Sequence, residues 1–284
     1  AFDSSKTALV LGNHIGTDIA GASAQGNGTY GVSIETGSDN TLVGGATVAD
    51  RNLISGNSSS GVRVLSAANV VLRGNRIGTN AAGTLGLSGN ASGIEASGAG
   101  GLIVGGSGTG QGNLISGNYR GLYLVSTTGA IVRGNLIGTD AAGTGLVGNG
   151  YAGVDSNASA GMTLGGALPG EGNVIAGGGS AGVQWAFATG GTIQGNFIGV
   201  AAHGVSPLPN NLGVAFNGGS GVLVGGAAPG ERNVIACNGG PGVAVYSGSL
   251  HHAIRRNSMF ENGGQGIDLE WDGFRPHSAA RKTT

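Results

Sequence analysis

The chain has 284 residues, of which 64 are Gly, 10% are charged and 5% are aromatic, and its formal net charge is −1. So much Gly is typical of collagen-like or low-complexity chains, but no Gly-X-Y period is present, and Val, Ile and Leu recur at set positions. The small net charge gives no reason to expect nucleic acid or an anionic membrane as a partner. No apolar run approaches the roughly 18 residues of a membrane span. Because Cys237 is the one cysteine, an intrachain disulfide is excluded.

An Asn followed three or four residues later by a Gly recurs along the chain, at intervals of about thirty residues. These residues are Asn27, Asn57, Asn90, Asn118, Asn149, Asn210, Asn238 and Asn262, with Gly178 in the place of the missing one. A longer interval, about sixty residues, separates two further sets of Asn. Gly-Asn-x-Ile-Gly contains Asn13, Asn75, Asn135 and Asn196, and Asn-Leu/Val-Ile begins at Asn52, Asn113, Asn173 and Asn233. The repeating unit is therefore a pair of non-identical coils, here called A and B.

Within each coil the apolar residues alternate over three short runs. Residues 61–92 contain Val62-x-Val64, then Val70-Val71-Leu72, then Ile77 with Leu85-x-Leu87. A spacing of two predicts β-strands, and no helical spacing is present. Such short strands form a core only if successive coils stack, each strand pairing with its equivalent about 4.8 Å away. The sequence thus predicts an all-β fold: a parallel β-helix of about nine coils without significant α-helix.

The Asn and Gly columns fit this fold. Asn tolerates turn conformations, and its amide can hydrogen-bond to the next Asn of a stacked ladder. We expect Gly at the following corner to adopt a positive φ that permits a sharp bend.

The runs Gly-Asn-Leu-Ile-Gly-Thr-Asp (134–140) and Gly-Asn-Leu-Ile-Ser-Gly-Asn (112–118) resemble the right-handed parallel β-helix repeats of large bacterial secreted and surface proteins. Those repeats belong to the pectate-lyase-like superfamily, and the resemblance covers residues 9 to about 272. It implies a right-handed β-helix and an extracellular or cell-surface location. It does not select a function, because the superfamily includes polysaccharide lyases, hydrolases, esterases and non-catalytic domains.

We predict a β-helix domain over residues 1–272 and a non-repetitive tail over 273–284. The chain opens inside a repeat and shows no signal peptide, so we expect a mature or excised fragment. A β-helix exposes strand edges at both ends. We therefore expect the first coil to be covered by its leading residues or by a second chain, and the tail from 275 is the candidate cap at the other end. Uncovered coil ends would allow two copies of the chain to associate through their strand edges.

The A coils carry an insertion after Ile-Gly-Thr, which predicts a row of protruding loops. Asp18 and Asp140 begin two of these loops. A calcium site there would need six to eight oxygen ligands, whereas an Asx turn needs only the one carboxylate. We therefore predict no cofactor, with calcium as the alternative.

The residue two places after each corner Gly is expected to point outward. This column contains Arg63, Glu95, Tyr123, Asp155 and Gln184 on consecutive coils, with Trp185 near one end. Glu95 and Asp155 should lie about 9.6 Å apart by backbone. That separation suits the acid and base of an inverting glycosidase, roughly 6.5–9.5 Å apart. The hypothetical catalytic residues are thus Glu95 and Asp155, with Tyr123 as a binding or proton-relay group and Arg63 as a base or substrate clamp. The hypothetical substrate-binding residues are Gln184, Trp185 and the outward Arg73 and Arg133.

Three functions fit these observations to different degrees. The regular repeats favour a structural or glycan-binding module of an extracellular protein, because catalysis usually comes with irregular loops. The alternative is a polysaccharide-active enzyme, a hydrolase, lyase or esterase, that uses the outward strip. An ice- or mineral-binding surface would need an unbroken outward array of Thr or Asn, and the column is too mixed for that.

Overall fold

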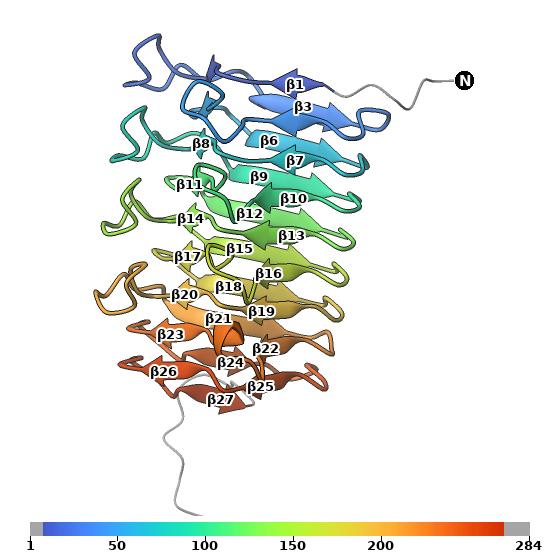
Figure 1. The fold of residues 1–284 in the computed structure, drawn as a ribbon, viewed down its shortest axis with the longest axis vertical. Helices are drawn as coiled ribbons and strands as arrows, with labels where there is room; N and C mark the ends of the chain where they lie inside the picture. Colours follow the sequence, from blue (N-terminus) through green and yellow to red (C-terminus); the bar gives the residue numbers. More distant parts are fainter. Residues whose placement is uncertain (1–7, 270–284) are drawn as a thin grey trace, which may run out of the picture.

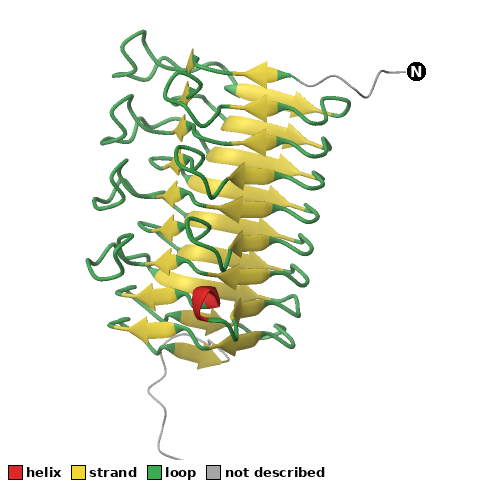
Figure 2. Cartoon of the chain, in the orientation of Figure 1, coloured by secondary structure: helices red, strands yellow, loops and turns green. Residues whose placement is uncertain are grey.

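Residues 8–269 of the chain are described by a computed structural model, in which successive turns stack along one long axis (Figure 1). Each turn contributes one strand to each of three sheets, and within residues 8–269 the strands of every sheet are paired in parallel. The one helical element within residues 8–269 is the single 3-10 turn η1 (Pro229–Glu231), red in Figure 2. The predicted all-β parallel helix is therefore confirmed. None of the described residues forms a helix long and apolar enough to cross a bilayer. The predicted boundary at 272 and the tail 273–284 lie outside the described residues.

The first sheet has nine strands in the described residues. They are β1 (Leu9–Val10), β4 (Leu42–Val43), β7 (Val71–Leu72), β10 (Ile103–Gly105), β13 (Ile131–Arg133), β16 (Thr163–Gly165), β19 (Thr192–Gln194), β22 (Leu223–Gly225) and β25 (Ala253–Arg255).

The second sheet also has nine strands within residues 8–269. They are β2 (His14–Ile15), β5 (Leu53–Ile54), β8 (Arg76–Ile77), β11 (Leu114–Ile115), β14 (Leu136–Ile137), β17 (Val174–Ile175), β20 (Phe197–Ile198), β23 (Val234–Ala236) and β26 (Ser258–Phe260).

The third sheet has nine strands over the same described range, and most of them are longer than those of the other sheets. They are β3 (Val32–Glu35), β6 (Ser60–Leu65), β9 (Ser92–Ser97), β12 (Arg120–Val125), β15 (Ala152–Asn157), β18 (Ala181–Ala186), β21 (Leu212–Asn217), β24 (Val243–Val245) and β27 (Ile267–Leu269). In β6, Val62 and Val64 are fully buried while Arg63 between them is partly exposed, as the alternation of strand side chains requires.

Two stacks of Asn side chains connect the turns, and the first is continuous. In the first, between the first and second sheets, each side-chain amide donates to the Oδ1 of the next Asn at 2.8–3.0 Å. Its members are Asn13, Asn52, Asn75, Asn113, Asn135, Asn173, Asn196, Asn233 and Asn257. The second stack precedes the third sheet; where Gly178 replaces Asn, its backbone N–H donates to Asn210 Oδ1 at 2.9 Å. The predicted Asn stacking is confirmed.

The corner Gly residues have a different role from the one expected. Gly61, Gly93 and Gly121 are not among the residues with positive φ. Instead, a Cβ at Gly61 would lie 2.7 Å from the carbonyl oxygen of Gly93 and 2.9 Å from Ile77 Cγ2. The corner therefore needs Gly because the next coil approaches too closely for a side chain.

The expected row of A-coil loops is present, and it lies at the left of Figure 1. Each loop is closed by an antiparallel bridge, as at Thr79↔Gly86 and Thr139↔Leu146. Leu85, which the period-two pattern placed in a strand, lies in such a loop with 65% of its surface exposed. The assignment of Leu85 to a strand was wrong, because Leu85 lies within the loop that this bridge closes and its side chain points away from the stacked core.

The first and last turns leave strand edges without a neighbour among the described residues: β1, β2 and β3 at one end, β25, β26 and β27 at the other. The segments expected to cover them, 1–7 and 275–284, lie outside those residues, so covered ends stay a prediction.

Unpaired edges are templates for further pairing. We expect either a concentration-dependent increase in mass by light scattering or slow hydrogen exchange of the Leu9 amide, which faces the open edge. A monomer at all concentrations with fast exchange of this amide would contradict the prediction.

Candidate functional site

The outward column of the third sheet has the register that the repeat spacing predicted. Its residues are paired in the order Ser33, Arg63, Glu95, Tyr123, Asp155, Gln184, Ala215, Ala244 and Asp268. The five polar residues from Arg63 to Gln184 thus occupy consecutive rungs of one outer face. We call these five residues the polar strip.

The N-terminal half of the polar strip forms local pairs. Arg63 forms a salt bridge with Glu35 at 3.0 Å, and its guanidinium lies 4.9 Å from the centroid of the Tyr30 ring. Glu95 accepts a hydrogen bond from the hydroxyl of Ser60. Both long side chains therefore interact with the preceding rung, and no hydrogen bond or ion pair connects Arg63 with Glu95 in the described structure.

The middle of the strip is organised by Arg120, a residue that the outward column did not include. Its Nε donates to Asp155 Oδ2 at 2.8 Å. Its guanidinium lies 5.1 Å from the ring centroid of Tyr119, 4.7 Å from that of Tyr123 and 4.9 Å from that of Tyr151. One cation thus holds three aromatic rings from two neighbouring turns. We call the three rings the tyrosine platform.

The outermost ring of the platform is accessible. Half of Tyr119 is exposed, 51%, and its ring stacks on Tyr151 with centroids 5.8 Å apart and planes at 28°. Stacked rings fixed by a cation lose little conformational entropy when a ligand binds. A comparison between repeats could have indicated this cluster, because Tyr119 and Tyr151 both stand two residues before a corner Gly.

Asp155 has little contact with water. Only 6% of its surface is exposed. Burial raises the pKa of its carboxyl above the usual value, and the hydrogen bond and charge of Arg120 oppose that rise without cancelling it. A carboxylate buried against an arginine leaves little surface for a substrate or an attacking water. The geometry therefore favours a role for Asp155 in holding Arg120.

The structure contradicts the assignment of Trp185 to a binding surface. Trp185 is fully buried and packs in the interior beside Phe216, with ring centroids 6.4 Å apart. Because Gln184 points outward, its neighbour must point inward, and nearness in sequence was a misleading guide. Gln184 itself is partly exposed on the rung after Asp155.

Arg73 and Arg133 lie away from the polar strip, at the ends of strands of the first sheet. Arg133 forms a salt bridge with Glu171 at 2.8 Å. Arg73 follows β7 and is half-buried. The structure therefore does not bring either of them together with Glu95 or Asp155.

The carboxylates considered for calcium instead organise their own loops. Asp18 Oδ1 accepts the Ala22 N–H at 2.7 Å, and Asp140 Oδ1 accepts the Thr144 N–H at 2.9 Å. Across residues 8–269 no group of three or more His, Cys, Asp or Glu side chains has a geometry that could hold a metal ion.

A comparison with protein families agrees with this architecture. A family described as "Right handed beta helix region" matches residues 7–164. A solved structure, that of an alginate lyase from Paenibacillus sp. str. FPU-7, is similar over 84% of this chain and 87% of that chain, with 13% identity and a TM-score of 0.34. No curated protein sequence matches the chain.

The buried carboxyl of Asp155 predicts a distinctive pH dependence of stability. Because its folded pKa lies above the reference 3.8, the folded state binds more protons there than the unfolded state. Its stabilising contribution is complete below pH 3.8 and is lost as pH rises through the folded pKa. We expect the unfolding free energy of the wild type, minus that of Asp155→Asn, to fall over this window in urea titrations.

Asp18→Asn is the matched control. Backbone hydrogen bonding, first from Ala22, lowers the pKa of Asp18, so its contribution is lost as pH falls through the folded pKa. The two differences should therefore have opposite signs of slope. A wild-type minus Asp155→Asn difference that rises with pH would show that the Arg120 ion pair outweighs the burial of Asp155.

Proposed function

Because the chain belongs to the family of right-handed β-helix regions, we propose that it is a binding module of an extracellular or cell-surface protein, which holds a sugar chain on the outer face of its third sheet. The tyrosine platform carries the proposal. Three rings fixed around Arg120 offer rigid apolar faces with polar rims, the combination that recurs at recognition surfaces.

The parallel stacking suits an extended ligand. Equivalent residues repeat about every 4.8 Å along a flat sheet, so successive units of a linear polymer can meet successive rungs. Tyr119 and Tyr151 would stack on sugar faces, and the partly exposed Glu95 and Gln184 would supply hydrogen bonds on either side. The platform is formed before a ligand arrives, which lowers the entropy lost on binding.

The second candidate is a polysaccharide-active enzyme, favoured by Glu95 and Asp155 standing two rungs apart with Tyr123 between them. The burial of Asp155 against Arg120 weighs against it, because an inverting hydrolase needs room for water between its carboxyl groups. We therefore place binding first and hydrolysis, lyase or esterase chemistry second.

A glycan array followed by calorimetry on the best ligand tests the binding proposal. Tyr119→Ala should weaken binding about tenfold, because one exposed stacking surface is removed. Phe260→Ala is the matched control, since Phe260 is an exposed aromatic residue of the second sheet, and it should bind like wild type. Equal affinities of Tyr119→Ala, Phe260→Ala and wild type for every ligand found would reject the platform.

The same array ligands, screened for cleavage products, separate the two candidate functions. A binding module yields no product, and Glu95→Gln changes its affinity only slightly. Turnover by the wild type that Glu95→Gln abolishes, with binding retained, would establish the enzyme in place of the module.

A further inference from the structure

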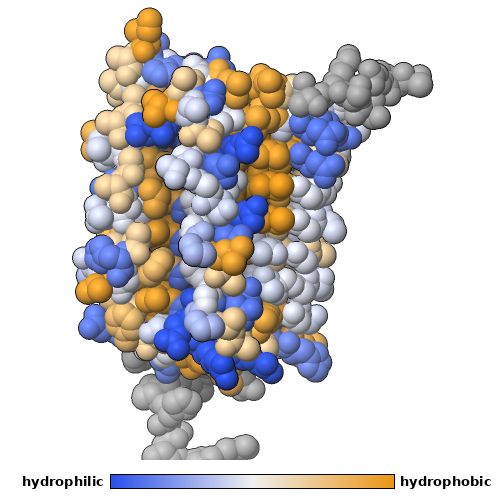
Figure 3. Space-filling model, in the orientation of Figure 1, coloured by the Kyte–Doolittle hydropathy of each residue, from blue (hydrophilic) through white to orange (hydrophobic). Residues whose placement is uncertain are grey.

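A long groove lies over the second sheet, on a different face from the tyrosine platform. Its walls are the row of A-coil loops and the row of B-coil loops at 45–51, 106–112, 166–172 and 226–232. Two cavities lie along it, of about 430 and 410 Å³. Gly170 lines both cavities, so they are neighbours. A column of apolar residues, orange between the loops in Figure 3, follows the same path.

Arg76 is an arginine in the floor of this groove, between the apolar Leu53 and Leu114. The outward residues of the second sheet are, in order, His14, Leu53, Arg76, Leu114, Leu136, Val174, Phe197, Val234 and Ser258. The next A coils have Leu136 and Phe197 in the place of Arg76. The fold therefore does not require a cation at this position, because an apolar side chain occupies the equivalent position two coils later.

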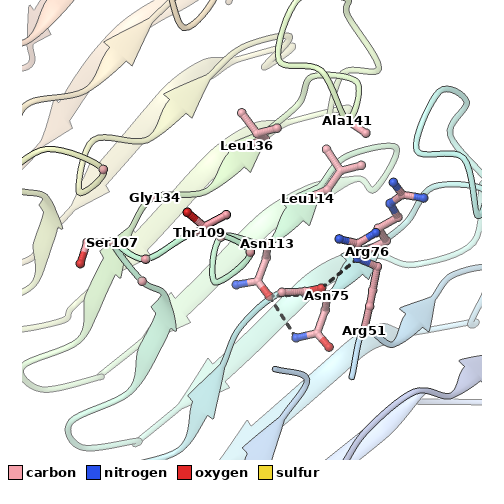
Figure 4. Close-up of a pocket in the computed structure, with 16 residues that line it drawn as sticks. Arg51, Asn75, Arg76, Ser107, Thr109, Asn113, Leu114, Gly134, Leu136 and Ala141 are labelled. Atoms are coloured by element: carbon pink, nitrogen blue, oxygen red, sulfur yellow. Dashed lines mark hydrogen bonds between the residues drawn. The ribbon is translucent and has the colours of Figure 1, made fainter. Parts of the chain in front are cut away.

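A second arginine lies beside it. Figure 4 shows Arg51 and Arg76 at one edge of the first cavity, with Leu114 and Leu136 along its floor. Arg51 Nε donates to the Gly74 carbonyl at 3.3 Å, which fixes its position. Burial lowers the pKa of Arg76, and repulsion from Arg51 lowers it further. Two like charges so placed destabilise the empty site.

No carboxylate compensates these charges within the described residues. The lining of the first cavity includes Arg51 and Arg76 but neither Asp nor Glu. The salt bridges found in residues 8–269 involve Arg63, Arg120 and Arg133 instead. Ser107 and Thr109 add hydroxyl groups to the opposite wall. The cavity thus contains donors and positive charge, and no carboxylate of residues 8–269 lines it.

The A-coil loop above the cavity lies close to Arg76. Gly83 has a φ of +72°, and a Cβ there would lie 2.8 Å from Leu114 Cδ2 and 3.3 Å from Arg76 Nε. A side chain at this position would press on the guanidinium. The cavity volume of about 430 Å³ falls in the range of small-ligand sites.

We propose that the cavity lined by Arg51 and Arg76 binds an oxyanion: a phosphate, sulfate or carboxylate group, as a free ion or as a substituent of a larger ligand in the groove. Guanidinium groups match oxyanions through pairs of parallel N–H donors. The anion would also remove the repulsion between the two arginines. This site is separate from the sugar-binding platform and does not depend on it.

Calorimetry with inorganic phosphate, sulfate, and carboxylated or sulfated oligosaccharides tests the proposal. Arg76→Leu introduces the residue that the next A coil has in this place, so the variant is expected to fold. It should weaken binding at least tenfold, and without anion it should raise the urea midpoint because the repulsion is gone. Arg255→Gln removes one exposed positive charge from the first sheet and is the control, with wild-type binding.

Comparing the free ions with the charged oligosaccharides distinguishes the source of the anion. Binding of inorganic phosphate or sulfate that Arg76→Leu loses supports a site for a free ion. Binding of a charged oligosaccharide alone, lost in Arg76→Leu but not in Arg255→Gln, supports a site for a substituent. Equal binding by wild type and both variants, or binding of none of these probes by wild type, would overturn the proposal.

Discussion

The hydrogen bonds between stacked Asn side chains are the constraint on which this structure depends. Each buried amide in the first ladder bonds to the next turn and to a backbone carbonyl, as Asn173 does to Asn196 Oδ1 and to the Val132 oxygen. A slip of one residue in any turn would leave both groups unpaired, and an unpaired buried polar group costs about 1–3 kcal/mol. The ladders therefore fix the register of all three sheets.

A fixed register leaves the outward columns free to vary. The interior accepts Val, Ile and Leu in repeated positions, and the corners require Gly because the next coil is too close. Neither constraint applies to side chains that point outward into solvent. Tyr123, which contacts Arg120, occupies such a position on the third sheet, and Arg76, beside Arg51 of a neighbouring loop, occupies one on the second. Both proposed sites thus use outward residues that differ between turns, while the core and corner residues repeat. The residues of each site could therefore change without loss of the fold.

The sequence was sufficient for the fold and for the register of the polar strip, because Asn and Gly recur at every turn and the strand period decides which residues point out. It was not sufficient for contacts. Arg120 stands one residue before its corner Gly, where the neighbouring turns have Ser92 and Ala152, so no column indicated it. Trp185 was misplaced because nearness in sequence was preferred to strand alternation. Arg76 could have been found by comparing A coils, since Leu136 and Phe197 occupy the same place.

The most direct test of the account is the stability of Asn173→Ala beside that of Asn13→Ala, from urea unfolding. Asn173 is fully buried and accepts both the backbone and side-chain N–H of Asn135 at 3.0 and 2.9 Å. Asn13 is exposed at the end of the same ladder. The account predicts a loss of roughly 2–4 kcal/mol for Asn173→Ala and less than about 1 kcal/mol for Asn13→Ala. Equal, small losses in both variants would show that the ladder does not hold the turns in register.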